Sequence, residues 1–246
     1  GDADCVEAIS PCLADDRLCD PAARALVSIN TPNAAEALCK SLEAAANARR
    51  IAVVQALGEL RCKACIEPIT KDALGEDAPL RRTAVYALAK IGDITSLPIL
   101  ARISETGVPH DKAEATALYI EYTRNLAAGG AVKEAETICR ELMAERSAQT
   151  DSNVRCEALA TLADIKGKAV LDDLLAAVDT NDKELRGCAL RLACNVSDKR
   201  STGQWIEKLK AADPERRVEI IRMLGDRGDQ SALFAIVSAF KDDDKN

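Results

Sequence analysis

An arginine that recurs every 31 residues constrains the fold of this chain more than any other feature. Each copy follows a short polar segment and opens an apolar run. We call these positions anchors: Arg50, Arg81, Arg155, Arg186 and Arg217, together with two that are not arginine, Cys19 and Lys112. Arg81 and Arg155 are 74 residues apart, which is twice 31 plus 12, so the repeat that starts near Lys112 contains an insertion of about twelve residues. A period of this length is typical of repeat proteins built from one supersecondary unit.

Three apolar columns keep the same register relative to the anchors. Seven residues after the anchors stand Leu26, Leu57, Leu88, Tyr119, Leu162, Ala193 and Leu224. Ten residues after them stand Ile29, Leu60, Ile91, Tyr122, Ile165 and Val196. Nineteen residues after them, outside the inserted repeat, stand Leu38, Ile69, Leu100, Leu174, Trp205 and Ile236. The first two columns share one face of a helix. We therefore expect each repeat to be a pair of helices that stacks on its neighbours.

An acidic column four residues before the anchors predicts where helices begin. Its members are Asp15, Asp77, Asp151, Asp182 and Asp213. An Asp at this place accepts hydrogen bonds from free N–H groups of the first helical turn and suits the positive end of the helix dipole. We expect each anchor arginine to bond the capping Asp of its own or a neighbouring repeat. The expected structural ladder is Asp77, Arg81, Asp151, Arg155, Asp182, Arg186, Asp213 and Arg217.

The composition agrees with closely packed helices. Aromatic residues make up 2% of the chain and apolar residues 48%, whereas β-sandwiches and barrels draw more on aromatic and β-branched residues. Gly92-Asp93 and Gly228-Asp229 mark turns between the two helices of a repeat. We predict an all-α chain of about seven to eight helical hairpins.

The stretch from Asp77 to Asp93 reads Asp-x-x-x-Arg-x-x-Ala-x-x-Ala-Leu-x-x-Ile-Gly-Asp. It resembles the HEAT-like repeats of the short phycobilisome-lyase type, and the resemblance covers nearly the whole chain. It implies a right-handed α-α superhelix, with the Arg-anchored helices lining the concave face. Such repeats serve many unrelated roles, so the resemblance indicates the fold and not an activity.

We expect one repeat domain over residues 1–240. Its irregular part is an extended hairpin within residues 112–154, where the insertion lengthens both helices around the turn at residues 127–130. The extension is either a variation in loop length without a function or an element that projects from the solenoid and contacts a partner. Residues 241–246 form an acidic tail or the start of a linker to a further domain.

Charge and motif content exclude several classes of function. The net charge of −7 argues against a nucleic-acid surface, which needs clustered Lys and Arg. No stretch reaches the roughly 18 apolar residues that a membrane-spanning helix needs. The single histidine, His110, is expected in a solvated loop. The chain lacks a phosphate-binding Gly loop and a Gly-x-Ser-x-Gly elbow. We expect no catalytic residue, no cofactor and no metal.

Ten cysteines are expected to be small buried residues of the core, most of them free thiols. They are Cys5, Cys12, Cys19, Cys39, Cys62, Cys65, Cys139, Cys156, Cys188 and Cys194. Cys62-x-x-Cys65 is the one local pair that could form a disulfide or half of a metal site. The lack of a second such pair argues against zinc. Disulfides between cysteines of neighbouring helices remain an alternative to free thiols.

A polar stripe opposite the buried face is the expected binding surface. Positions five and nine residues after the anchors lie on this side of the helix. The candidate residues are Arg24, Gln55, Glu59, Tyr86, Lys90, Glu121, Arg191 and Arg222. Tyr and Arg are enriched at binding hot spots, which favours contact with a protein or peptide. A solvated face of mixed charge would explain the same residues.

We interpret the chain as a non-catalytic protein-interaction or scaffolding module that could position a fused domain. One alternative, implied by the resemblance, is a lyase- or isomerase-like enzyme with an exposed cysteine of low pKa. The other is a nucleic-acid-binding repeat array, which the acidic balance disfavours. We expect Gly1 to be a processing scar, so the protein is cytoplasmic or exported with its signal peptide removed.

Overall fold

The chain is helical throughout the part that the structure describes. The computed structural model describes residues 2–106, 109–145, 152–196 and 199–243, and these contain no strand. This confirms the predicted all-α class built from helical hairpins. Residues 1–135 and 136–246 form two compact units. The single repeat domain over residues 1–240 stays a prediction.

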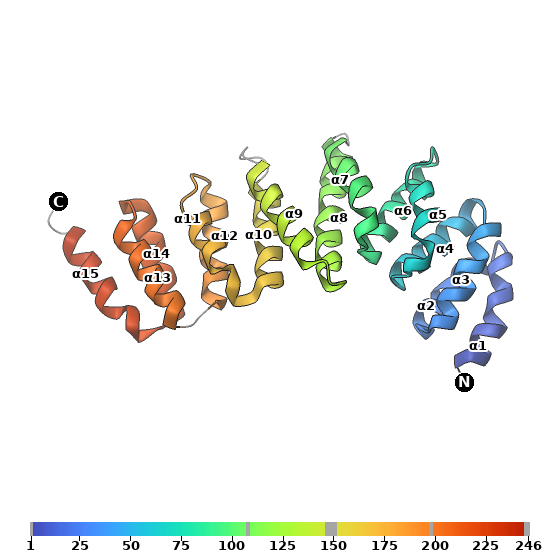
Figure 1. Cartoon of the computed structure of the whole chain (residues 1–246), viewed down its shortest axis with the longest axis horizontal. Helices are drawn as coiled ribbons and strands as arrows, with labels where there is room; N and C mark the ends of the chain where they lie inside the picture. Colours follow the sequence, from blue (N-terminus) through green and yellow to red (C-terminus); the bar gives the residue numbers. More distant parts are fainter. Residues whose placement is uncertain (1, 107–108, 146–151, 197–198, 244–246) are drawn as a thin grey trace. The chain divides into compact units, whose positions relative to one another are not determined.

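Each hairpin consists of an anchor helix, which carries the anchor residue, and a return helix, which leads to the next repeat. The anchor helices are α2 (Cys19–Ile29), α4 (Asn47–Glu59), α6 (Ala78–Ile91), α8 (Pro109–Ala128), α10 (Ser152–Lys166), α12 (Lys183–Asn195) and α14 (Pro214–Arg227). The return helices are α3 (Pro32–Ala44), α5 (Ile66–Ala73), α7 (Leu97–Thr106), α9 (Val132–Glu145), α11 (Leu171–Val178), α13 (Lys199–Ala211) and α15 (Leu233–Asp243). The helix α1 (Asp2–Ile9) precedes them. Within each unit, successive hairpins lie side by side in sequence order (Figure 1).

The predicted apolar columns form the core of both units. The side chains seven residues after the anchors are all buried. In the column at nineteen, Leu38, Ile69, Leu174 and Trp205 are fully buried, and Trp205 belongs to the core of the second unit. Burying a Leu or Ile side chain stabilises a fold by roughly 2 kcal/mol. In the column ten residues after the anchors, Ile91, Tyr122 and Val196 are buried, whereas Ile29, Leu60 and Ile165 are partly buried. The repeat register is therefore largely the register of the hydrophobic core.

A residue in the left-handed conformation sets the turn inside a hairpin. Eleven residues after their anchors, Asn30, Gly92 and Gly228 have φ angles of 49°, 64° and 64°. Arg61 holds the same place with φ at 52°, a conformation that costs a residue with a Cβ about 1–2 kcal/mol. The left-handed turn is thus kept in this repeat without Gly or Asn. In the repeat anchored at Arg155, Lys166 holds the same place with φ at −88°, and the left-handed residue is the next one, Gly167, with φ at 54°.

The inserted repeat has longer helices and different core residues. The helix α8 has 20 residues, and α10, the next longest anchor helix, has 15. Tyr122 donates a hydrogen bond to the carbonyl of Asp93 at 3.0 Å, and Asn125 donates to that of Ala89 at 2.9 Å. Both bonds tie α8 to the end of α6. His110, expected in a loop, lies in the first turn of α8 because the helix begins at Pro109.

The acidic column caps the anchor helices or the turn before them. Asp77, Asp182 and Asp213 each accept a hydrogen bond from the backbone N–H three residues ahead, at 3.0, 3.1 and 2.9 Å. Asp15 accepts the same bond at 3.1 Å in the turn before α2. Asp151 lies outside the described residues. An N-cap of this kind stabilises a helix by about 1 kcal/mol.

The anchor arginines bond a backbone carbonyl at the end of the preceding return helix or one to two residues beyond it. Arg50, Arg81, Arg155, Arg186 and Arg217 donate to the carbonyls of Leu42, Gly75, Met143, Thr180 and Ala212, respectively, at 2.7 to 3.3 Å. The last carbonyls of a helix have no partner within it and form the negative end of its dipole. A guanidinium at this place satisfies the carbonyl and fixes the joint between two hairpins.

The carboxylate partners of these arginines differ from the expected ladder. Arg155 pairs with Asp182 of the next repeat at 3.0 Å, which is one of the expected pairs. Arg50 instead pairs with Asp72 of α5 at 2.9 Å. Arg81 donates to the backbone carbonyls before its own cap. The difference arises because each guanidinium first reaches helix-end carbonyls, and its remaining N–H groups then take whichever carboxylate lies nearest.

Arg186 is the most enclosed of the anchor arginines. Its side chain is 3% exposed and pairs with Glu215 at 3.2 Å and Glu219 at 3.0 Å, both on α14. It therefore joins α12, the end of α11 and the start of α14 through one planar group. Glu219 is about one-third exposed, so water solvates part of its carboxylate and weakens the ion pair.

We expect Arg186→Met to lower the free energy of unfolding by about 2–4 kcal/mol, because it leaves carboxylates and a helix-end carbonyl without their buried partner. Chemical denaturation followed by circular dichroism measures the loss. Arg24→Met is the control, since Arg24 forms an exposed pair with Asp20 on one helix, and it should cost less than about 0.5 kcal/mol. Equal losses would show that the buried network contributes little.

Two anchor helices of the first unit approach closely at a glycine. A Cβ on Gly58 of α4 would lie 2.6 Å from the Cα of Ala87 on α6, well inside contact distance. Gly225 holds the same repeat position in α14, eight residues after its anchor. A Cβ there meets no atom of the described chain within 4 Å. The two glycines are therefore matched in helix position and differ in packing.

We expect Gly58→Ala to destabilise the protein by about 1–3 kcal/mol, because two backbones would have to separate. Gly225→Ala should be neutral or stabilise it by up to about 1 kcal/mol through helix propensity. Thermal unfolding of the two variants beside the parent measures both effects. A Gly58→Ala protein as stable as the Gly225→Ala protein would contradict this close approach.

Candidate functional site

Four of the predicted stripe residues form one chain of side-chain contacts in the first unit. The Tyr86 hydroxyl donates a hydrogen bond to Glu59 at 2.6 Å. Lys90 lies over the Tyr86 ring, with its Nζ 5.3 Å from the ring centre, and pairs with Glu121 at 2.7 Å. These residues belong to α4, α6 and α8, so the contacts run across three successive anchor helices. The 31-residue repeat explains why these side chains meet. Consecutive members of the chain of contacts are 27, 4 and 31 residues apart, which is one helical turn or about one repeat.

The surroundings of Tyr86 keep its phenol neutral. Desolvation, and then the hydrogen bond and negative charge of Glu59, raise the pKa of Tyr86 above its ordinary value. The hydrogen bond to Glu121 raises the pKa of Lys90, so the ammonium over the ring stays charged at neutral pH. A cation over an aromatic face contributes roughly 0.5–1 kcal/mol at an exposed site. The aromatic ring is thus held in one orientation from two sides.

The remaining stripe residues are exposed and take no part in this chain of contacts. Arg24 pairs with Asp20, one turn earlier on α2, at 3.1 Å. Gln55 on α4 is exposed. Arg191 and Arg222, in the second unit, are exposed on α12 and α14. The structure therefore brings four of the eight candidates together, and the other four take no part in these contacts.

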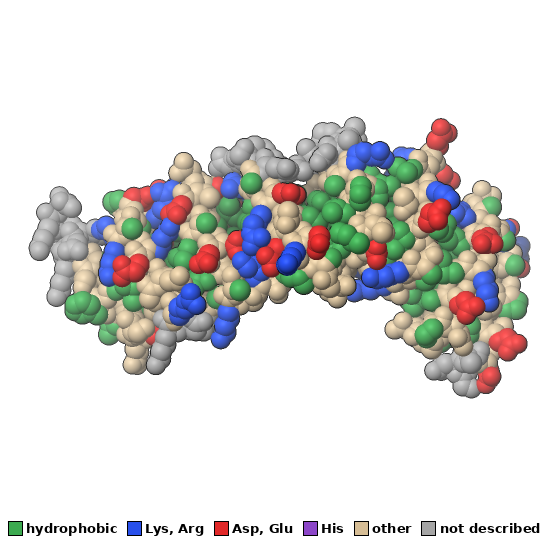
Figure 2. Space-filling model, viewed as in Figure 1, with side chains coloured by type: hydrophobic (Ala, Val, Ile, Leu, Met, Phe, Trp, Pro, Cys, Tyr) green, Lys and Arg blue, Asp and Glu red, His purple; other side chains and the backbone are tan. Residues whose placement is uncertain are grey.

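The surface carries charges of both signs. On the face drawn in Figure 2, acidic and basic side chains are interspersed over each unit, with apolar side chains between them. Opposite charges at this spacing give no extended field of one sign. No described helix is long and apolar enough to cross a membrane.

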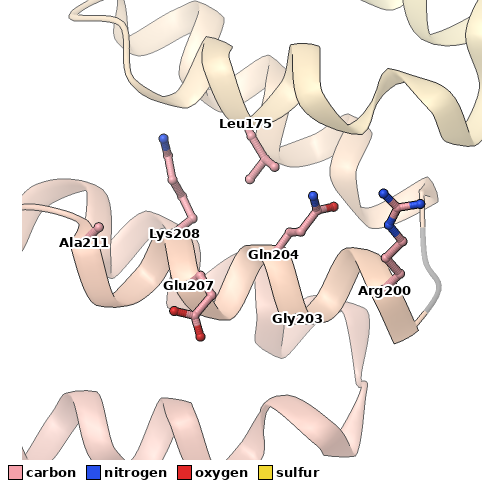
Figure 3. A pocket seen from close by; sticks show the side chains of 7 residues that line it. All are labelled: Leu175, Arg200, Gly203, Gln204, Glu207, Lys208 and Ala211. Carbon is pink, nitrogen blue, oxygen red and sulfur yellow. The ribbon is translucent and has the colours of Figure 1, made fainter.

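A shallow pocket lies in the second unit between two return helices. Leu175 of α11 forms one side, and Arg200, Gly203, Gln204, Glu207, Lys208 and Ala211 of α13 form the other. Gln204 and Lys208 point toward Leu175, whereas Glu207 points away (Figure 3). Lys208 pairs with Asp179. The lining offers no acid and base facing each other, so the pocket has no arrangement for general acid–base catalysis.

Three cysteines come together in the first unit. Cys39 of α3 forms a disulfide with Cys65, in the 3-10 turn at Lys63–Cys65 before α5. The Sγ atom of Cys62 lies 3.3 Å from that of Cys39. The three sulfur atoms lie within 4.8 Å of one another. We call these residues the cysteine triad.

The triad differs from the expected free core thiols. The sequence identified Cys62-x-x-Cys65 as a local pair, and the disulfide instead joins Cys65 to Cys39, 26 residues earlier. The sequence did not predict Cys39 as the partner of Cys65, because no motif near Cys39 indicates a disulfide. The available signal was the repeat register, since Cys39 lies in the middle of the return helix α3 and Cys62 and Cys65 lie in the turn of the next hairpin.

Four other thiols are held in the protonated form. Burial raises the pKa of Cys19, Cys188 and Cys194, and raises that of Cys156 to about 12. A nucleophilic cysteine needs the opposite shift, toward thiolate at neutral pH. These four residues therefore suit packing and not covalent catalysis.

We expect Glu59→Gln to lower the pKa of Tyr86, because the carboxylate charge that disfavours phenolate is removed. Glu59→Ala, which also removes the acceptor, should lower it further. A pH titration of ¹³Cζ-labelled tyrosine by NMR, with the Tyr86 signal assigned from Tyr86→Phe, measures the midpoint. Glu67→Gln on α5, whose carboxylate pairs with Lys71, is the matched control and should leave the midpoint unchanged. An unchanged midpoint in both Glu59 variants would contradict the Tyr86–Glu59 contact.

Comparison with known proteins agrees with this geometry. Residues 36–120 match the family model for HEAT repeats, and residues 154–180 match that for the PBS lyase HEAT-like repeat. No curated protein matches the chain. The two matched segments lie in different units and carry the same anchor register, and the helices are paired in the way these repeats require. The chain is a HEAT-like repeat protein.

Proposed function

We propose that this helical repeat scaffold is a non-catalytic module that binds a protein or peptide through the stripe on its anchor helices. The observation that carries the proposal is the chain of contacts from Glu59 through Tyr86 and Lys90 to Glu121. The same surface could hold a fused domain of its own chain in position.

Pre-organisation is the physical basis of this proposal. Binding orders side chains at a cost of about 0.5–1.5 kcal/mol for each flexible residue that is immobilised. Tyr86 and Lys90 are already held by their neighbours, so a partner that contacts them would lose less entropy. Tyr is also among the residue types that dominate binding hot spots. The exposed Gln55 and Arg24 can add hydrogen bonds at the rim.

Non-catalytic action is supported by the chemistry of the described residues. The pocket on α11 and α13 lacks a facing acid and base, and burial raises the pKa of Cys19, Cys156, Cys188 and Cys194. Interspersed charges of both signs also suit a protein partner better than a polyanion, whose binding depends on many released counterions.

A photo-crosslinking experiment tests where the partner binds. A benzophenone amino acid replaces Gln55 or Arg222, one exposed stripe position in each unit, and the protein is irradiated in an extract of the cells that produce it. We expect discrete adducts from at least one of these positions. Adding Tyr86→Ala should weaken binding about 30-fold, as expected for a hot-spot residue worth about 2 kcal/mol.

Exposed positions on return helices serve as matched controls. The same group at Glu36 on α3 or Lys210 on α13 should give no such adduct. Adducts from these helices alone, or equal adducts from both sets, would contradict binding through the stripe. A folded protein containing a thiol that reacts orders of magnitude faster than glutathione would instead support a cysteine-based enzyme.

A further inference from the structure

The cysteine triad combines one bonded pair with a third sulfur at close range. Cys65 is 5% exposed, while Cys39 and Cys62 are partly exposed. The Cys62 Sγ lies 3.3 Å from the Cys39 Sγ, and no two of the three sulfurs are more than 4.8 Å apart. The group can therefore be reached from solvent on one side and is enclosed on the other.

Cys62 occupies a position that three other repeats use for helix capping. Cys62 stands twelve residues after its anchor, where Asp93 and Asp229 each accept a hydrogen bond from the backbone N–H two residues ahead. Thr31, at the same position, caps α3. Cys62 makes no side-chain capping bond in the described structure. The repeat gives up a contact worth about 1 kcal/mol to bring a sulfur to this place, and the neighbouring Arg61 keeps the left-handed turn without Gly or Asn.

The neighbouring columns show the same substitution of sulfur for ordinary packing residues. Cys65 stands where other repeats have Ala34, Ser96, Val170, Ser201 and Ala232. Cys39 stands where other repeats have Thr70, Ala101, Leu175, Ile206 and Val237. Single cysteines at such positions are ordinary core residues. Three of them meeting at one joint between hairpins, one at the expense of a cap, indicate a site.

We propose that Cys39, Cys62 and Cys65 form a three-thiolate site for one thiophilic divalent or monovalent cation, and that the Cys39–Cys65 disulfide closes this site. A dithiol reductant opens it: two electrons and two protons pass from the dithiol to the Cys39 and Cys65 sulfurs, the S–S bond breaks, and the dithiol becomes its own disulfide. The cation then displaces the protons of the three thiols, which pass to water, and three metal–sulfur bonds form.

The geometry of the triad fits such a cation after reduction. A metal–sulfur bond of about 2.3 Å places the sulfurs of a tetrahedral or trigonal centre roughly 3.8–4.0 Å apart. The three sulfurs already lie within 4.8 Å of one another, so rotation of the side chains suffices. Three protein ligands leave one coordination position open to water, and the partly exposed Cys39 and Cys62 leave room for it. Soft thiolate ligands select Zn²⁺ and Cu⁺ over Mg²⁺ and Ca²⁺.

Zn²⁺ and Co²⁺ are the probes that test the proposal on the full chain. Isothermal titration of the dithiol-reduced protein, freed of reductant, should show one Zn²⁺ bound with a Kd below about 1 µM. Co²⁺ should give a sulfur-to-metal charge-transfer band whose intensity reports three thiolates. The oxidised protein should bind at least about tenfold more weakly, because two of its ligands are joined in the disulfide. A reduced protein without this Zn²⁺ site would overturn the proposal.

Variants and a footprint separate the triad from the other thiols. Cys39→Ser, Cys62→Ser and Cys65→Ser should each abolish the high-affinity binding of one Zn²⁺ per protein. Cys156→Ser, in the second unit, should retain this binding. In the unaltered reduced protein, Zn²⁺ should slow alkylation of the three triad cysteines, as mapped by mass spectrometry, and leave the rate at Cys5 unchanged. Retained binding in all three triad variants, or protection spread over other cysteines, would contradict the assignment even if one variant unfolds.

Discussion

The bond from an anchor arginine to the end of the preceding return helix is the contact on which the stacking depends. A helical hairpin buries only one face by itself, so the angle and spacing at each joint decide whether the next hairpin covers the other face. The guanidinium acts at that joint, because its planar fork can reach a helix-end carbonyl and a carboxylate together. The recurrence of one residue type every 31 positions follows from the recurrence of one joint. An apolar residue there would leave the helix-end carbonyls without a partner.

Departures from this regular scheme separate structural from functional features. In the inserted repeat, Tyr122 and Asn125 bond carbonyls at the end of α6, so the longer helix is fixed by its own contacts. At the cysteine triad, a thiol stands where Asp93 and Asp229 make capping bonds in other repeats. Natural sequences tend to break local rules where function requires it. The triad breaks the capping rule of the repeats, whereas the longer helix does not.

The polar stripe shows how a mixed-charge surface can be ordered without being buried. Each of its contacts is individually weak, since exposed ion pairs contribute roughly 0–1 kcal/mol. Linked from Glu59 to Glu121 across three helices, they restrict the rotamers of Tyr86 and Lys90. The rigid backbone of the repeats supplies the spacing and the side chains supply the orientation. A binding surface of this kind depends on the register of the repeats as much as the core does.

The sequence by itself determined the repeat, the helical class, the core columns and the helix caps, because these depend on local periodicity and on the free N–H groups at the start of each helix. Trp205 and the column of Leu26 were assigned to the core from spacing alone. The tertiary structure decided what lies across a joint: Arg50 with Asp72, Arg186 with Glu219, Tyr86 with Glu59, and Cys39 with Cys65. Residues that meet across helices are set by interhelical angle and distance, which a linear pattern does not contain. The arginine column could therefore be read from the sequence, while the carbonyls that it bonds became visible only in the fold.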